Sequence, residues 1–362
     1  MSKLSFRSAT AILLVFYMGS SDVLGMSTGL GADAWIAYLV GLLTALPLLL
    51  ILARLVQLTP GMDLYAMLDY TLGKWLATIV SILYFCYFIT MAAMVRGYYG
   101  TFVQLTSLPH TPLVVILLLF FAVCAYLAKS GVETLGKWST LWGVAAISAA
   151  VLLTLLAIPS MRLENLLPIA ASGEGAIVRE GSRFAFLPFG EAVVMLALLG
   201  RLDRQASPYK LFFLGASLAA GFFVLTFLRD AAVLGGGSMD TLRYPFFQAA
   251  GVLQIGSGLA RIEALVTLPV ILTGLTKVAV CLIAAAGAAR RILGLMEGDS
   301  VLVPIALFSL GLSVILFGNL TALSAFPNLH LRVALLFQIV IPVILWLIAE
   351  GKRLRKPVLA KE

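Results

Sequence analysis

Hydrophobic residues along this chain form long continuous runs, and short polar connections separate them. A membrane-spanning helix needs about 20 predominantly apolar residues. Continuous runs favour helices over the strands of a membrane barrel, in which apolar and polar positions alternate. We therefore predict an all-α integral membrane protein with about ten transmembrane helices, at approximately 8–29, 33–56, 75–103, 112–129, 138–158, 184–200, 210–234, 261–289, 300–319 and 332–349.

The connections between these runs are too short to hold a large soluble domain. The longest polar ones cover about 159–183 and 235–260. The first run follows Lys3 and Arg7, as in a secretory signal peptide, but no small-residue cleavage site comes after it. We predict that it is retained as a helix of a single transmembrane domain, 1–362, with a short basic tail at 350–362.

The composition excludes a water-soluble enzyme of this length. Hydrophobic residues make up 61% of the 362 positions and charged residues 12%, whereas a soluble domain has about 45–50% and about 25%. The mean hydropathy of +1.05 agrees with this conclusion. Such a chain needs membrane lipid as part of its solvent.

The net charge of +8 is best explained by loops that face anionic lipid, so we expect no nucleic-acid partner. With the N-terminus inside, sixteen Lys and Arg fall on the inner side and seven on the outer side. Cytoplasmic loops carry the excess of Lys and Arg. The pattern predicts that both termini are cytoplasmic.

The cysteines and histidines indicate neither a disulfide framework nor a metal site. Cys86, Cys124 and Cys281 all lie in apolar runs, where they are typical small core residues. His110 and His330 are far apart and fall in predicted outer loops, where we expect them to be solvated. We therefore expect no metal ligand set, no cofactor and no intramembrane enzyme chemistry.

The first and sixth runs are interrupted in a matching way. Each contains a helix breaker followed by an acid: Gly19, Ser20, Ser21 and Asp22 in the first, and Pro188, Phe189, Gly190 and Glu191 in the sixth. Five spans separate the two runs, so the second half inserts upside down relative to the first. Interrupted spans at corresponding positions of two inverted halves indicate a transporter-type binding site. The alternative is that these residues only kink or pack the helices.

This pattern predicts a 5+5 inverted repeat with helices 1 and 6 broken, a transporter-like fold with halves at about 8–158 and 184–349. A broken helix frees backbone amides and carbonyls in mid-membrane, where they are tolerated beside a cavity or a protein partner. Freed amides suit a carboxylate, and freed carbonyls suit an ammonium group. A free amino acid carries both groups.

Several ionisable residues lie in or near the predicted spans, where charges are costly and are functional candidates. Lys277 is in the middle of the eighth span, near Thr273 and Thr276, and its partner is predicted to be Glu191 or Asp22. The pair belongs either to a ligand cavity or to a structural ion pair that fixes packing. The others are Arg229, Asp230, Arg261 and Glu263, near outer ends, for which we favour structural roles.

An aromatic residue of the third span is a further candidate. Among Tyr84, Tyr87, Tyr98 and Tyr99, we select Tyr87 as the one that covers the ligand. Packing in the core or at the membrane interface is the alternative for all of them.

Three stretches of this sequence resemble the B subunit of spore germinant receptors, the endospore germination permease family of the amino acid–polyamine–organocation superfamily. They are residues 186–192 (FLPFGEA), 131–136 (GVETLG), and 261–265 (RIEAL) with the following Lys277. The resemblance covers nearly the whole chain. It implies a spore inner-membrane protein that senses an amino acid or similar nutrient, in complex with an A-type subunit and a lipoprotein C-type subunit.

The resemblance also implies a ligand cavity among spans one, three, six and eight. By that analogy the binding residues are the two interrupted segments, Gly19–Asp22 and Pro188–Glu191, together with Thr273 and Lys277. A proton- or cation-coupled amino acid transporter needs the same cavity and stays open as an alternative, as does a purely structural scaffold.

Overall fold

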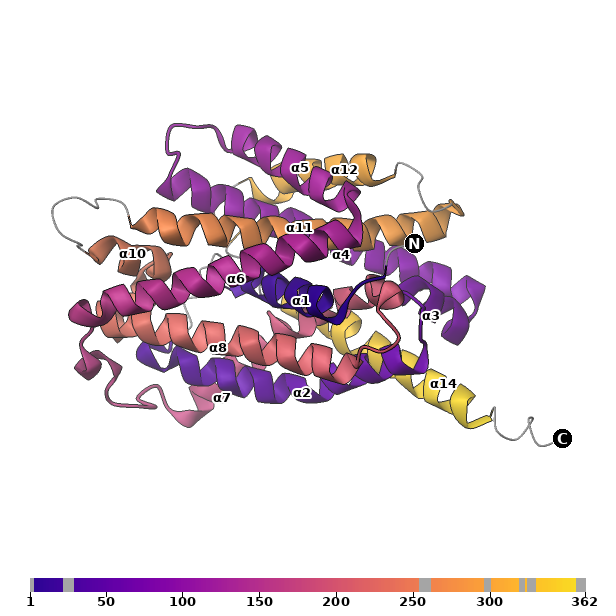
Figure 1. The fold of residues 1–362 in the computed structure, drawn as a ribbon, viewed down its shortest axis with the longest axis horizontal. Coiled ribbons are helices and arrows are strands. Elements are labelled where there is room, and N and C mark those ends of the chain that lie inside the picture. Colours follow the sequence, from indigo (N-terminus) through magenta and orange to yellow (C-terminus); the bar gives the residue numbers. More distant parts are fainter. Residues whose placement is uncertain are drawn as a thin grey trace.

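The computed structural model describes residues 3–21, 29–253, 262–295, 301–318, 323 and 330–355 (Figure 1). This part of the chain contains helices and turns and a single isolated bridge between Leu4 and Leu202, but no strand. The main helices are α1 (Phe6–Ser21), α2 (Ala34–Leu58), α3 (Leu64–Leu72), α4 (Lys74–Thr106), α5 (Leu113–Lys129), α6 (Gly131–Ala157), α7 (Glu174–Phe186), α8 (Pro208–Leu234), α9 (Gly236–Thr241), α10 (Pro245–Val252), α11 (Glu263–Leu293), α12 (Leu302–Phe317) and α14 (Ile341–Arg355).

Short helical turns link these helices: η1 (Gly31–Asp33), η2 (Ile158–Ser160), η3 (Leu163–Leu166), η4 (Phe189–Ala197), η5 (Leu199–Arg201) and the π-helical turn η6 (Leu336–Val340). Six helices of the described chain are long and apolar enough to cross a membrane, and three shorter apolar helices accompany them. With the interrupted segment 174–201, they correspond to the ten predicted spans. The prediction of an all-α membrane protein is confirmed.

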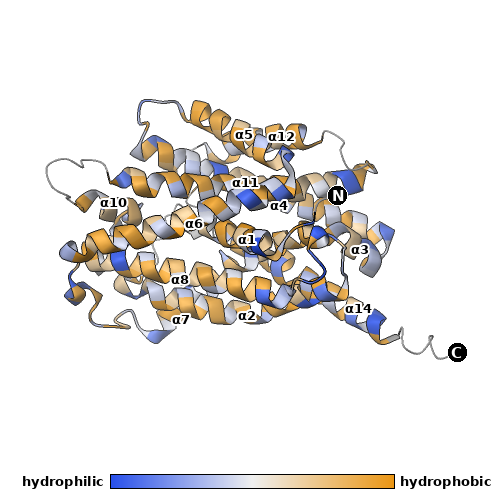
Figure 2. Ribbon diagram, viewed as in Figure 1, coloured by the Kyte–Doolittle hydropathy of each residue, from blue (hydrophilic) through white to orange (hydrophobic). Residues whose placement is uncertain are grey.

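Apolar residues make up most of the helices of the bundle (Figure 2), and many of their large side chains are exposed. Leu119, Leu141 and Ile315 are examples of large side chains that are mostly exposed. Most of the strongly hydrophilic stretches of the ribbon lie toward the two ends of the bundle (Figure 2). This distribution fits a protein whose sides face lipid tails and whose ends face water.

Helix α1 lies inside the bundle and contacts α6, α8 and α11. Helices α4 and α11 pack along each other, and α5 and α12 cover them on one side (Figure 1). On the other side, α2 packs against α7 and α8, where the rings of Tyr38 and Phe184 stack with centroids 4.0 Å apart. The helices that meet at the centre are therefore α1, α4 and α11, together with the second half of the interrupted sixth span.

The sixth span is broken where the sequence predicted. Helix α7 ends at Phe186, and η4 begins at Phe189 after Leu187 and Pro188. Proline has no backbone N–H to continue a helical ladder, so a break at this position is expected. The break places Glu191 on a short separate segment inside the bundle.

The first span differs in detail from the prediction. We expected an interruption from Gly19, but α1 stays helical through Gly19 and Ser20 and ends at Ser21. Asp22, the acid predicted in this break, lies outside the described residues. The helix persists because Gly19 packs directly against α11, and this contact compensates for its low helix propensity.

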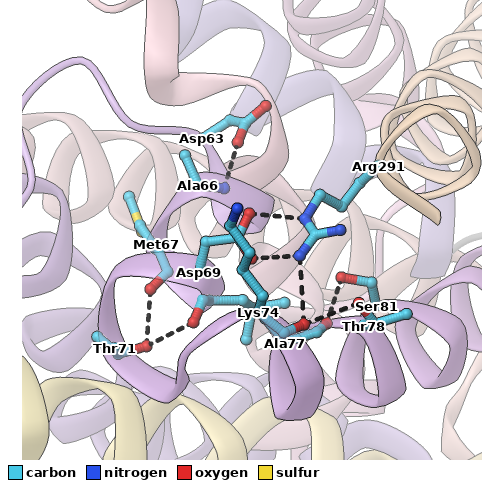
Figure 3. Close-up of polar contacts among 11 residues, drawn as sticks. Asp63, Ala66, Met67, Asp69, Thr71, Lys74, Ala77, Thr78, Ser81 and Arg291 are labelled. Carbon is cyan, nitrogen blue, oxygen red and sulfur yellow. Dashed lines mark hydrogen bonds and ion pairs between the residues drawn. The ribbon is translucent and has the colours of Figure 1, made fainter. Parts of the chain in front are cut away.

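Helix α3 was not predicted as a separate element, and it lies at the end of the bundle where both chain ends lie (Figure 1). The Asp63 carboxylate caps it by accepting a hydrogen bond from the Ala66 amide at 2.8 Å. Asp69 forms a bidentate ion pair with Arg291 of α11 (Figure 3). Lys352 donates to the Tyr70 carbonyl. These contacts fix α3 to α11 and α14.

Candidate functional site

An ion pair between Glu191 and Lys277 lies at the centre of the bundle. Glu191 is on η4 and Lys277 is in the middle of α11, and both side chains are fully buried. The Lys277 ammonium donates to Oε2 of Glu191. Either charge alone would be costly in this environment, and the pairing reduces that cost. Of the two partners predicted for Lys277, Glu191 or Asp22, the structure pairs it with Glu191, and Asp22 lies outside the described residues.

His330 joins this pair from the beginning of the last span, His330–Leu354. Its Nε2 is 3.7 Å from Oε1 of Glu191, and its side chain is 4% exposed. We expected a solvated histidine in an outer loop, and that expectation is wrong. The imidazole is buried because it stacks on the Tyr87 ring at 5.6 Å and lies beside a carboxylate.

Tyr87 is buried on α4 and faces this cluster. Its hydroxyl accepts a hydrogen bond from Nε2 of Gln338 at 2.9 Å, and its ring stacks on Phe337 at 4.5 Å. Oε1 of Gln338 is buried with no hydrogen-bond partner within the described chain. A free amide oxygen beside an ion pair is a ready acceptor for a ligand donor.

Gly190 lets η4 approach the last span closely. A Cβ atom at this position would lie 2.1 Å from Oε1 of Gln338. The preceding residue, Phe189, contacts Tyr17 edge-on at 5.5 Å, and its carbonyl accepts a hydrogen bond from the Tyr17 hydroxyl at 3.4 Å. The backbone freed by the break after Pro188 is therefore partly satisfied by α1.

Helix α1 closes the site from the other side. A Cβ atom at Gly19 would lie 2.8 Å from the Thr273 carbonyl oxygen and 3.0 Å from Cβ of Lys277. The Lys277 ammonium lies over the Phe16 ring, 4.6 Å from its centroid. The described structure says nothing of the side chains of Ser20 and Ser21. Gly19 therefore belongs to the contact around Lys277.

The hydroxyl of Thr273 is used within its own helix. It donates to the Val270 carbonyl at 2.7 Å. Thr273 also lines a mainly apolar pocket between α1, α6, α8, α10 and α11, together with Met18 and Arg229. The structure thus places Thr273 one helical turn from Lys277 without joining its hydroxyl to the ion pair.

Arg229 and Asp230 do not reach the membrane interface as we expected. Both are buried, and the Arg229 guanidinium pairs with the Asp230 carboxylate through an Nε–Oδ1 hydrogen bond of 2.8 Å. They neutralise each other because no water is available to solvate either group. Glu263 begins α11 near Gly251, and Arg261 lies outside the described residues.

Arg96 is the largest departure from the expected charge distribution. Arg96 is one of the seven Lys and Arg residues that the charge pattern places on the outer side, but it is fully buried on α4. Its Nη1 donates to the hydroxyls of Ser309 at 3.2 Å and Ser313 at 3.5 Å, both on α12. Within the described chain it forms no ion pair with a carboxylate. Arg96 is therefore a buried cation held by neutral groups.

The site residues that sequence reasoning missed are His330, Gln338, Tyr17 and Phe16. Gln338 left a detectable signal, since it is a polar side chain within an otherwise apolar run. Outside the two interrupted segments and Thr273, the sequence analysis selected only charged residues and tyrosines of the third span. Tyr17 and Phe16 have no such signal, because aromatic residues are ordinary in a membrane-spanning helix.

Solved transporters share this fold. The manganese transporter of Eremococcus coleocola, in a mutant form, superposes with a TM-score of 0.66 at 15% identity, over 95% of this chain and 83% of that chain. A Na⁺-coupled sialic acid symporter, in a substrate-bound outward-open state, superposes with a TM-score of 0.63 at 13% identity, over 92% and 79%. Likeness at this identity establishes the fold and nothing about the substrate.

Relatives of this chain are found in Bacillus subtilis (strain 168). Spore germination protein KB is 24% identical over 98% of this chain and 96% of its own length. Spore germination protein A2 is 23% identical over 51% of this chain and 50% of its own length. The sequence model described as "Spore germination protein" matches residues 3–348. The chain therefore belongs to the spore germination protein family, the spore permeases, and has the fold of a membrane transporter.

Proposed function

We propose that this chain is the membrane subunit of a nutrient germinant receptor, which binds a small amino acid or similar nutrient and triggers spore germination. The observation that carries the proposal is the buried Glu191–Lys277 pair, on an interrupted segment and an intact helix. Membership of the spore germination family supports the germination part. The transporter fold supports a ligand site at the interrupted segment.

The ligand class follows from the charges at the site. Glu191 offers a carboxylate and Lys277 an ammonium group, the two groups that a free amino acid also carries. An entering amino acid would place its ammonium on Glu191 and its carboxylate on Lys277, so both buried charges keep a partner. The free amide oxygen of Gln338 would accept a further N–H of the ligand. An apolar or uncharged molecule could not replace both halves of the pair.

Binding at this site requires movement. Glu191 and Lys277 are fully buried, and α1 touches α11 at Gly19, so the described arrangement has no space beside the pair for an amino acid. A ligand that binds only when η4 and α1 separate from α11 stabilises the separated state. Such a shift is what partner subunits would detect.

The partners and location extend the same proposal. Relatives named spore germination protein KB and A2 support assembly with A-type and C-type receptor subunits. The family supports a place in the spore inner membrane. The excess of Lys and Arg at one end supports an orientation with both termini in the cytoplasm.

An amino acid transporter, coupled to protons or cations, is the second candidate. The solved structures with this fold are a manganese transporter and a sialic acid symporter, which is the observation that favours it. Transport and sensing need the same ligand site. They differ in whether the bound molecule is released on the opposite side.

The test combines ligand binding and uptake on one purified sample. The free amino acids are screened by thermal shift in detergent, because a true ligand raises the melting temperature with concentration. The radiolabelled hit is then followed into proteoliposomes. Binding without uptake supports the receptor, and uptake driven by a proton or sodium gradient supports the transporter.

Two variants connect this result to the proposed site. E191Q and K277M should each abolish the shift produced by the hit, whereas R229M changes another buried ion pair and should leave the shift intact. All three are first checked for folding by their own melting curves. If folded E191Q and K277M proteins bind every hit as the unmodified chain does, the site is elsewhere.

A further inference from the structure

A second polar space lies apart from the Glu191–Lys277 pair, at the end of the bundle where both chain ends lie (Figure 1). It has a volume of about 520 Å³. The ends of α3, α5, α6, α11 and α12 and of the η4–η5 segment surround it. Its charged lining residues are Asp63, Lys129, Arg201 and Arg290. We call this space the basic vestibule.

The charge in the basic vestibule is not balanced by its single acid. The Asp63 carboxylate is used to cap α3 through the Ala66 amide (Figure 3). Within the described residues, neither Lys129 nor Arg290 forms an ion pair, and Nε of Arg290 is buried without a hydrogen-bond partner. A buried guanidinium N–H that lacks an acceptor is costly. The vestibule therefore has unused capacity for negative charge.

The next residue along α11 provides a direct contrast. Arg291 makes two hydrogen bonds to the Asp69 carboxylate and a third, at 3.4 Å, to the Lys74 carbonyl (Figure 3). Adjacent residues of a helix point in different directions, so the two arginines have different surroundings. The anion that pairs with Arg291 is Asp69 of the same chain, whereas Arg290 faces the vestibule and has no anionic partner in the part of the chain that the structure describes.

The backbone adds to the positive potential of this space. Helix α12 has 16 residues and begins at Leu302 on the vestibule wall, and among the described residues its N-cap residue, Val301, provides no side-chain cap. The amides of its first turn therefore lack an intrahelical acceptor, and the helix start carries partial positive charge. Phosphate and carboxylate groups bind at such positions when cationic side chains accompany them.

We propose that the basic vestibule is an oxyanion site for a phosphate group. Arg290 provides the bidentate donor and Lys129 a mobile point charge, on two helices that meet at the space. The chemistry is the same whether the phosphate belongs to a free small molecule or to the head group of an anionic lipid. Arg290 and Lys129, which form no ion pair within the described residues, give a phosphate group two cationic contacts.

This site is separate from the nutrient site proposed above. Along α11, the hydroxyl of Tyr65 donates to the Ala284 carbonyl, and its ring fills the space that Gly287 leaves open. Both contacts lie between Lys277 and Arg290 in the sequence of the helix. Changes at the vestibule can therefore be tested without altering the residues that surround Glu191.

The test uses the full chain in nanodiscs of phosphatidylcholine, titrated with inorganic phosphate and followed by the unfolding temperature and by calorimetry. Phosphate should raise the unfolding temperature with concentration. Arg290→Gln should weaken the apparent affinity about tenfold, as expected for loss of a charge-assisted hydrogen-bond pair. Lys129→Gln should weaken it less. Arg353→Gln removes the same charge from an exposed position on α14 and should change nothing.

A second arm replaces phosphatidylcholine with phosphatidylglycerol. If the phosphate comes from lipid, this exchange alone raises the unfolding temperature, Arg290→Gln removes the increase, and free phosphate has no effect. If the phosphate is free in solution, the exchange has no effect that depends on Arg290. Each result supports the oxyanion site and identifies its source.

The chain's own acids between α11 and α12, Glu297 and Asp299, lie outside the described residues and could compete for the same cations. Both arms are therefore repeated with E297Q/D299N. The proposal is overturned if neither phosphate nor phosphatidylglycerol gives an effect that depends on Arg290 or Lys129 in either background. Lys129→Gln keeps the test decisive if Arg290→Gln fails to fold, because Lys129 is exposed.

Discussion

Lys277 and Arg96 are both fully buried cations on neighbouring helices, yet the protein stabilises them in opposite ways. Lys277 has a full counter-charge, Glu191, which belongs to a different and interrupted segment. Arg96 has only the hydroxyls of Ser309 and Ser313, on one regular helix. An ion pair between two segments can be exchanged for a ligand when the segments separate. Hydroxyls on a continuous helix offer no such exchange.

The comparison therefore assigns different roles to two similar charges. At Lys277, a ligand can replace Glu191 as the ionic partner. Arg96 instead contributes to the constant packing of α4 against α12. The predictions below are ordered from the largest expected effect to the smallest.

The first prediction concerns Lys277. K277M leaves Glu191 charged and buried, which should destabilise the chain by about 3–5 kcal/mol, as does removal of one partner of other buried pairs. E191Q should have a similar effect, because it leaves the Lys277 ammonium buried without a counter-charge. The double variant E191Q/K277M buries two neutral groups and should recover most of the loss. Unfolding of the four proteins in one detergent measures the coupling.

A double variant no more stable than the singles would contradict this account, because it would mean that the two side chains act independently. The stability of the double variant also depends on His330. Its imidazole is 3.7 Å from the same carboxylate, so part of the recovery depends on its position. Repeating the cycle with His330→Asn separates that contribution.

The second prediction concerns the neutral partners of Arg96. S309A/S313A removes both hydroxyls that accept from its guanidinium, and a buried donor left unsatisfied costs about 1–3 kcal/mol. Adding R96M should restore stability, because a methionine needs no acceptor. Melting curves measure stability, and nutrient binding by thermal shift should be unchanged in the triple variant. A loss of binding there would place Arg96 in the nutrient site.

The third prediction concerns Gly190, which holds the interrupted segment against the last span. A Cβ at this position would lie 2.1 Å from Oε1 of Gln338, so G190A should cost about 1–3 kcal/mol through overpacking. Q338A makes room and should offset part of that cost in the double variant G190A/Q338A. Gly221, with open space around its Cβ position, provides the matched control G221A.

Part of this comparison could be predicted from the sequence. A lysine in the middle of an apolar run is costly wherever it is buried, so the need for an acid partner was evident before the fold was known. The break at Pro188 was equally evident, since its ring cannot donate a backbone hydrogen bond. Both signals are local, and both were confirmed.

The rest depends on tertiary packing that the local pattern does not encode. Arg96 is ten residues from the end of α4, a helix that extends further than we predicted, so it falls inside the bundle instead of at the interface. His330 follows a connection that looks like a solvated loop in sequence, and its burial depends on Tyr87, which is more than 200 residues away. Gly19 remains helical because of its contact with α11.

The last prediction uses a third cation, Arg291, as a calibration. Its pair with Asp69 has the same chemistry as the central pair, but the two side chains are 24% and 34% exposed. Water already solvates both groups, so D69N should cost only about 0–1 kcal/mol, and added salt should reduce the effect further. The central pair should show no such dependence on salt, because it is shielded from the solvent. If D69N proves as costly as K277M under the same conditions, burial does not distinguish the two pairs. The difference between an exchangeable and a fixed charge would then have to come from the interrupted segment alone.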